Sequence, residues 1–242
     1  MSVLLVPIAP LSRTKSRLRD CFSQNQLREL TISMFKDLAN TLLKVKVFDE
    51  KIVYCNTSEI LEIADDYNLT SIKERLTLPR KSFDDVIKDL NTIALKKYNA
   101  SETLFTFLDL ILISKKNFNE VYSLLRKNQL VLCPAIHSAG ISLLGRNPPN
   151  IIPTYFSNPT TPSLVALLNE ANRLDLKLVI YDSFRAGFDI DIKQDLVLAY
   201  EYLKIFNLTH TETYKFLKEN LKLSISKKNI EDNRDLEIKQ IK

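Results

Sequence analysis

The sequence predicts a single α/β domain with a mixed, mostly parallel sheet and helices on both faces. Short apolar runs alternate with longer stretches in which apolar residues recur every three or four positions, the pattern of strands alternating with amphipathic helices. The 242 residues suit one such domain, and no glycine-rich linker or internal repeat divides them. We therefore expect one domain over residues 1–223 and a charged tail over residues 224–242, either a frayed helix or disordered.

The N-terminal half begins with a strand and a long helix. The run VLLV predicts a buried strand over residues 2–8. Apolar residues recur at spacings of three and four over residues 23–46, and Ser23 with Gln26 makes a capping box at the start of this helix. The same patterns predict further elements in chain order, a strand at 51–56, helices at 59–67 and 82–97, a strand at 103–108 and a helix at 117–127.

The C-terminal half contains two strands with no helix between them. Apolar runs at 129–134 and 141–145 predict these strands, so we expect a mixed rather than a purely parallel sheet. Thr161 as the N-cap and Pro162 as the first helical residue predict a helix to about residue 174. The run LKLVIY predicts one more strand, and two periodic segments predict the closing helices; these elements span 176–181, 192–206 and 212–221.

Composition favours a small-molecule enzyme over a nucleic-acid binder or a membrane protein. The 34 Lys and Arg exceed the 29 Asp and Glu by a net charge of +5, and basic residues cluster in one short loop, so we expect no nucleic-acid partner. The three cysteines include no CxxC pair, which argues against a disulfide framework or a thiolate zinc site. His137 and His210 lack metal-ligand spacing and are expected to be polar surface or loop residues. No segment resembles a membrane span or a cleaved leader, so we expect a cytoplasmic protein without a membrane partner.

A basic loop follows the first predicted strand and is the candidate phosphate site. The chain has three glycines, which excludes a GxGxxG or Walker-type loop, so phosphates must be held by cationic side chains and ordinary backbone amides. Arg13, Lys15 and Arg17 stand at alternate positions where ligands of open α/β sheets collect. Arg binds phosphate oxygens in pairs and Lys acts as a point charge. The alternative is a solvent-exposed basic turn, which the spacing alone slightly favours.

Three acidic residues form a candidate metal site. Asp109 ends the apolar run TLFTFLD, where a lone carboxylate is costly to bury unless it is paired or bound to a metal. Asp189 and Asp191 lie two residues apart on an extended segment, so their side chains point to the same side. Gly187 just before them is expected to allow an unusual backbone angle. For Asp109, the alternative is a loop residue hydrogen-bonded to backbone amides, and we weight the two interpretations equally. For Asp191, the alternative is a cap of the next helix, with Gln194 at its third position.

Three segments together resemble the 2-phospholactate guanylyltransferases of coenzyme F-420 biosynthesis. They are VPIAPLSRTKSRL at 6–18, FLD at 107–109 and YDSFRAGFDIDIKQDL at 181–196. The resemblance extends from about residue 3 to about residue 203. It is most specific in the third segment, where the family pattern matches Asp182, Ser183, Ala186, Gly187, Asp189, Asp191 and Asp195.

This resemblance implies a GT-A-like, Rossmann-related nucleotidyltransferase that joins GMP from GTP to 2-phospho-L-lactate and releases pyrophosphate. Some relatives use phosphoenolpyruvate or 3-phosphoglycerate as the acceptor. The implied site residues are Asp109, Asp189 and Asp191 for Mg²⁺, Lys15 and Arg17 for catalysis and, with Arg13, for nucleotide binding, and Ser142 and Ser163 for the acceptor.

The chain departs from the family pattern in the acceptor and base regions. Ala9 stands where relatives usually carry lysine, and Ile141 stands where a threonine is usual. The segment near the base corresponds to residues 82–84. The alternatives are therefore a nucleotidyltransferase with another base or acceptor, or a non-catalytic nucleotide-binding relative. We expect GTP and a small phosphorylated acid as partners, and we leave open whether the chain forms a homodimer.

Overall fold

Seven strands form the central sheet of this protein. In the computed structural model, which describes residues 1–227 and 236–240, they are β1 (Ser2–Pro7), β2 (Glu50–Cys55), β3 (Thr70–Lys73), β4 (Glu102–Thr106), β5 (Leu130–Pro134), β6 (Ile141–Arg146) and β7 (Leu178–Ile180). Their order across the sheet is β3-β2-β1-β4-β6-β5-β7. β6 runs antiparallel to β4 and β5, while the other neighbours run parallel. The predicted mixed, mostly parallel sheet is confirmed.

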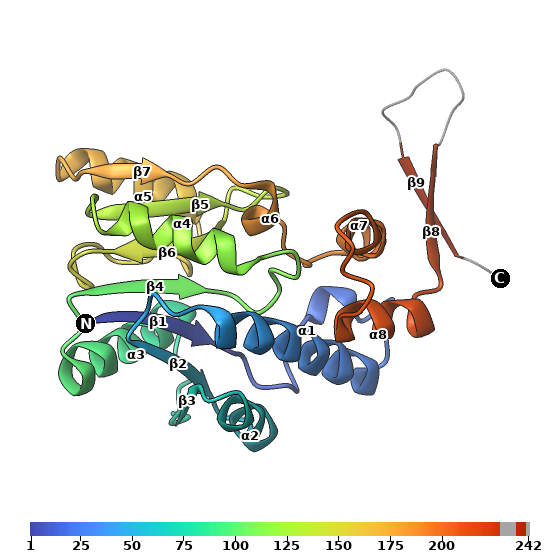
Figure 1. Cartoon of the computed structure of the whole chain (residues 1–242). Coiled ribbons are helices and arrows are strands. Elements are labelled where there is room, and N and C mark those ends of the chain that lie inside the picture. The colour runs from blue at the N-terminus through green and yellow to red at the C-terminus, as the bar shows by residue number, and fades with distance from the viewer. Residues whose placement is uncertain (228–235, 241–242) are drawn as a thin grey trace.

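Helices cover both faces of the sheet and the carboxyl ends of its strands (Figure 1). They are α1 (Gln24–Lys44), α2 (Ser58–Asp66), α3 (Phe83–Tyr98), α4 (Lys115–Leu125), α5 (Ser163–Arg173), α6 (Phe184–Gly187), α7 (Lys193–Ile205) and α8 (Glu212–Asn220). α1, α2 and α4 pack on one face and α3 and α5 on the other. Within residues 1–227 and 236–240, no helix combines the length and apolar character needed to cross a bilayer.

β1 is buried on both faces because its side chains alternate between two hydrophobic cores. Val3 and Leu5 pack into the core beneath α3 and α5. Leu4 and Val6 pack into the opposite core beneath α1, α2 and α4. This continuous burial is typical of a central parallel strand. It fixes the direction in which the following basic loop leaves the sheet.

A third core lies beyond the carboxyl ends of the strands, between the start of α1 and the helices α7 and α8 (Figure 1). Phe188 and Ile190 are fully buried in it. Burying side chains of this size contributes roughly 1.5–3 kcal/mol each. Because these two residues flank Asp189, their packing anchors the backbone that carries this acid.

Most predicted elements are confirmed, including the capping box of Ser23 and Gln26 on α1. The predicted N-cap at Thr161 is wrong, since Pro162 is the cap and Ser163 is the first helical residue. β3 and α6 were not predicted. Each has four residues, and β3 lies half-exposed at the edge of the sheet, so neither shows a clear apolar period.

The described part of the tail forms two strands, β8 (Leu223–Lys227) and β9 (Leu236–Gln240), which project from the end of α8 (Figure 1). They pair antiparallel, with Ile225 opposite Ile238. The prediction of a frayed helix or disorder is therefore wrong for these residues. The alternation of apolar and polar residues in LSISK and LEIKQ is a strand signal that the high charge of the tail concealed. Residues 228–235 and 241–242 lie outside the described residues, and the boundary at residue 223 stays a prediction.

Candidate active site

The basic loop leaves the carboxyl end of β1 and is anchored at both ends. Lys15 has a left-handed backbone, with φ 48° and ψ 41°, which is uncommon for a residue other than glycine. It precedes a short 3-10 helix, Ser16–Leu18, whose last residue is fully buried. The hydroxyl of Thr14 lies 3.0 Å from that of the buried Thr31 on α1. These contacts hold the loop so that the Lys15 side chain reaches the edge of the sheet.

The Lys15 ammonium group joins three segments that are distant in the sequence. Its Nζ lies 2.5 Å from Oδ2 of Asp109 and 3.2 Å from Oδ1 of Asp191, and it also donates to the carbonyl of Ile190. Its side chain is 8% exposed. Burial alone would lower the pKa of Lys15, but attraction and hydrogen bonds from the two carboxylates outweigh burial and raise it. Lys15 is therefore a buried cation, and the alternative of a solvent-exposed turn does not hold for it.

Three acids converge beside this cation. Asp109 follows β4, and Asp189 and Asp191 follow α6. Carboxylate oxygens of the three lie within 4.8 Å of one another, and all three residues are half-buried. The structure thus brings together the acids that the sequence separates by some eighty residues. Their role as metal ligands stays a prediction.

Mutual repulsion sets the electrostatics of this acidic cluster. Burial raises the pKa of Asp189, and the charges of Asp109 and Asp191 raise it further, to about 7, while Lys15 acts in the opposite direction. Carboxylates this close cannot all ionise without cost. A divalent cation relieves that repulsion, and hard carboxylate oxygens are the ligands such cations prefer. The donor set therefore fits a divalent metal.

We expect the affinity for a divalent metal to rise with pH. The metal binds the ionised form of Asp189, so binding releases the proton that this carboxyl holds. With a pKa of about 7, the ionised fraction grows from about a tenth at pH 6 to about nine-tenths at pH 8, which raises the apparent affinity roughly tenfold. Calorimetric titration with Mn²⁺ at these two pH values measures the change. Equal affinities at both would contradict the proton release.

Asp195 positions the backbone of Asp191. It is 1% exposed, and one of its oxygens accepts from the backbone N–H groups of Asp191 and Ile192, both at 2.8 Å. Its other oxygen lies 2.6 Å from Nδ1 of His137. The alternative of an Asp191 cap with Gln194 at the third position is wrong, because Ile192 is the cap and Asp195 the third residue. His137 looks isolated in the sequence because its partner lies 58 residues away.

Gly187 allows a close approach between α6 and the end of β5. The expected unusual backbone angle is wrong, since no glycine in residues 1–227 and 236–240 has a positive φ. Instead the carbonyl of Gly187 accepts from the N–H of Ile136 at 2.9 Å. A Cβ on Gly187 would lie 2.7 Å from the carbonyl oxygen of Pro134. The missing side chain is what lets the segment carrying Asp189 pack against β5.

We expect Gly187→Ala to destabilise the protein. The added methyl group must push α6 away from β5, a form of overpacking that costs roughly 1–3 kcal/mol. For a chain of this length, that corresponds to a fall in Tm of several degrees, measurable by circular dichroism. Gly140→Ala is the control, because its Cβ would mainly meet the movable hydroxyl of Ser138. Equal Tm values for the two variants would contradict the close-approach role of Gly187.

A cavity of about 360 Å³ opens over Asp109, Asp191 and the basic loop. Arg17 lies at its rim, with Nη1 3.2 Å from Oδ2 of Asp191 and a side chain that is 70% exposed. Arg13 lines this cavity and a second one of about 700 Å³. The residues shared by the two cavities are Pro7, Ala9, Arg13 and Phe83. The two cavities therefore adjoin along the basic loop.

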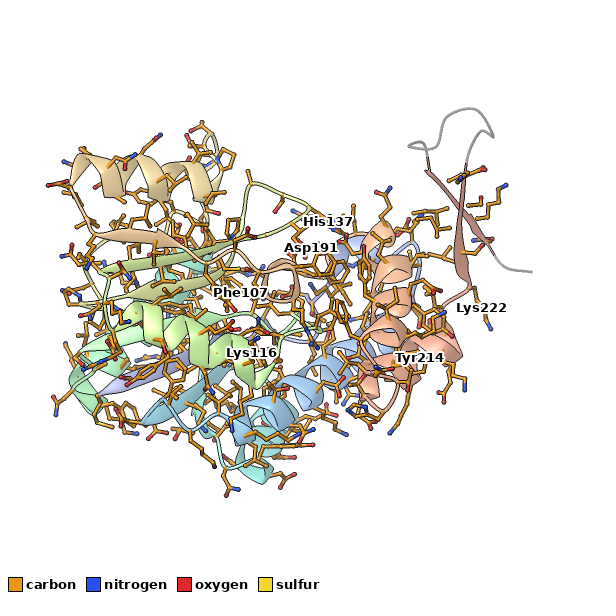
Figure 2. All side chains as sticks on the ribbon, turned by 45° about the horizontal axis from the view of Figure 1, so that its top comes forward. Phe107, Lys116, His137, Asp191, Tyr214 and Lys222 are labelled. Atoms are coloured by element: carbon orange, nitrogen blue, oxygen red, sulfur yellow. The ribbon has the colours of Figure 1, made fainter. Side chains whose placement is uncertain are left out.

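Three aromatic rings close the sheet side of the site. Phe83, Phe107 and Phe156 are mutual neighbours, with ring centroids 5.5–5.9 Å apart. Asp84, next to Phe83, links the segments of Phe83 and Phe156. Its carboxylate accepts hydrogen bonds from the backbone N–H groups of Phe156 and Ser157, both at 2.8 Å. Phe107 lies on the sheet side of the region where Asp191 and His137 are found (Figure 2). The sequence gives no signal for this cluster because its members come from three separate segments.

The two expected acceptor residues have different surroundings. Ser142 is 2% exposed in β6, and its hydroxyl donates to the carbonyl of Cys133 at 3.0 Å. Ser163 is half-buried at the start of α5. The N–H of Leu164 donates to the carbonyl of Ala139, so the first turn of α5 lies beside the loop after β5. A role for either serine in acceptor binding stays a prediction.

The chain that carries this site matches a known protein family. The family described as guanylyl transferase CofC like matches residues 1–240. The chain belongs to this family. A 2-phospho-L-lactate guanylyltransferase of Methanocaldococcus vulcanius is 27% identical over 213 residues, which cover 88% of this chain and 89% of that protein. A phosphoenolpyruvate guanylyltransferase of Thermobaculum terrenum is 24% identical over 195 residues, or 80% of each protein.

The fold of this CofC-like protein also matches a solved structure. A nucleotide-diphospho-sugar transferase of Desulfovibrio desulfuricans superposes with a TM-score of 0.73 at 14% identity, over 90% of this chain and 94% of that one. At this identity the likeness shows the fold alone. It confirms the expected nucleotidyltransferase fold, and the family confirms a nucleotidyltransferase enzyme.

Proposed function

We propose that this enzyme joins GMP from GTP to a phosphorylated three-carbon acid and releases pyrophosphate. The acceptor we propose is 2-phospho-L-lactate, with phosphoenolpyruvate and 3-phosphoglycerate as the alternatives. The reaction would serve coenzyme F-420 biosynthesis in the cytoplasm. The observation that carries the proposal is the meeting of Asp109, Asp189 and Asp191 with Lys15 at the carboxyl edge of the sheet.

The proposed reaction is a direct transfer. An oxygen of the acceptor phosphate attacks the α-phosphorus of GTP, in line with the bond to the β-phosphate. That bond breaks, its electrons leave with pyrophosphate, and a new phosphoanhydride joins GMP to the acceptor. No covalent enzyme intermediate is needed. Catalysis of this kind rests on positioning and on electrostatic stabilisation.

The side chains of the cavity supply positive charge, which offsets the repulsion between the triphosphate and the acceptor phosphate. Lys15 is held rigidly beside the acids, whereas the exposed Arg17 can turn toward a bound phosphate. Arg13 lies between the two cavities and can contact either end of a triphosphate. Asp109, Asp189 and Asp191 would hold Mg²⁺, which would supply positive charge to offset the negative charge of the phosphates.

A product analysis tests this proposal. The protein is incubated with GTP, Mg²⁺ and each of the three phosphorylated acids, and the products are identified by mass. We expect one acid to gain a guanylyl group, with one pyrophosphate released for each product. Parallel reactions with ATP, CTP and UTP test the base, and a product from one of these in place of GTP would overturn the proposed donor. Nucleotide binding without any product would indicate a non-catalytic relative.

A further inference from the structure

The larger cavity beside the phosphate site contains one buried acid. The cavity measures about 700 Å³, a volume typical of small-molecule sites, and adjoins the smaller cavity through the basic loop. Glu74 lines it directly after β3 and is 7% exposed. Its carboxylate oxygens are not among the fully buried, unpartnered atoms of the described residues, so the carboxylate is open to the cavity and a ligand there can bind it. Its surroundings therefore indicate what it binds.

The Glu74 carboxylate is unpartnered while its backbone is held firmly. Its N–H donates to the carbonyl of Cys55, and its own carbonyl accepts from Asn56, both at 2.9 Å. Within residues 1–227 and 236–240, the carboxylate accepts no hydrogen bond and forms no ion pair. The charges of Lys81 and Arg13 act on it from farther away. The acid is thus preorganised without a protein donor to satisfy it.

Part of the cavity wall is apolar and suited to a flat ring, beside the cations Arg13, Arg80 and Lys81. Leu76, Leu78 and Phe83 line it with exposed fractions of 50%, 99% and 39%. Exposed apolar side chains gathered around one cavity mark a ligand site more often than a plain surface. Phe83 also lines the smaller cavity, so a ring held here would be joined to phosphates lying over Lys15.

We infer that Glu74 reads the nucleobase and selects guanine through its N1–H and 2-amino donors. This inference rests on the proposed function and names the residue that sets its base specificity. Of the common bases, guanine alone presents two adjacent donors that match the two oxygens of a carboxylate. Adenine and cytosine turn a ring-nitrogen lone pair toward it, and uracil presents one donor between two carbonyl oxygens. Paired hydrogen bonds to a charged group are strong and directional.

A panel of purine nucleotides tests this inference in the wild-type enzyme. Inosine triphosphate lacks the 2-amino group and keeps N1–H. We expect its kcat/KM for pyrophosphate release to fall roughly 10- to 100-fold below that of GTP, the usual effect of losing one hydrogen bond to a charged group. Equal use of both nucleotides would overturn the inference and leave a GTP-dependent reaction intact. A wild-type enzyme that uses neither would instead overturn the proposed function.

Glu74→Gln adds a gain-of-function readout. The glutamine amide can accept from N1–H but presents a donor where guanine also presents one. Xanthosine triphosphate carries a carbonyl at that position, so we expect the variant to lose roughly 10- to 100-fold with GTP and to prefer xanthosine triphosphate. Glu62→Gln, an exposed position on α2, is the control and should keep the wild-type preference. A Glu74→Gln enzyme that still prefers GTP over xanthosine triphosphate would overturn the inference.

Discussion

Asp189→Asn is expected to lower pyrophosphate release about a hundredfold or more while the protein stays folded, because the variant removes one carboxylate from the proposed metal site. Burial and the neighbouring Asp109 and Asp191 raise the pKa of Asp189 from 3.8 to about 7, so the cost of ionising it in the folded protein grows between these pH values and is fully present above pH 7. The asparagine lacks that charge. Around pH 8 and without metal, we therefore expect a Tm equal to or above that of the wild type.

The two readouts separate catalysis from folding. Pyrophosphate release is measured with GTP, Mg²⁺ and the preferred acceptor, and Tm is measured by circular dichroism in a chelating buffer. Asp66→Asn, an exposed position on α2, is the matched control and should change neither. Full activity of Asp189→Asn would show that this acid has no part in the reaction. A strongly lowered Tm would show that its role is structural instead.

Lys15→Met is the second variant with a large expected effect. It removes the cation that we propose lies beside the reacting phosphates, and we expect a loss of activity of about a hundredfold or more. It also leaves Asp109 and Asp191 without their shared partner. Without metal we expect the free energy of unfolding to fall by roughly 2 kcal/mol, less than for fully buried pairs because Asp191 is half-exposed.

Metal addition distinguishes this electrostatic explanation from simple loss of packing. A divalent cation placed among the three acids should restore much of the lost Tm in Lys15→Met, because it replaces the missing positive charge. Lys116→Met on α4 (Figure 2) is the control. This side chain is 83% exposed, and its pair with Glu120 contributes little. A Tm of Lys15→Met that does not respond to Mn²⁺ or Mg²⁺ would contradict the proposed metal site.

Local patterns in the sequence determined most of the secondary structure and part of the site. The apolar periods predicted nearly every strand and helix, and Ser23 with Gln26 predicted the start of α1, because both signals act over a few residues. The two-residue spacing of Asp189 and Asp191 likewise indicated that their side chains point to the same side of the chain, because this pattern is also local. Short elements such as β3 and α6 were not predicted, because four residues are too few to show an apolar period.

Contacts between distant segments were decided by the tertiary structure alone. The bonds from Asp195 to Asp191 and His137, the burial of the Lys15 side chain and the isolation of the Glu74 carboxylate all depend on which strands and loops lie side by side. The residue sequence determined which segments become strands, helices and charged loops. Packing of the three cores then decided which of these side chains meet, because burial and charge interactions depend on distance in space and not on separation along the chain.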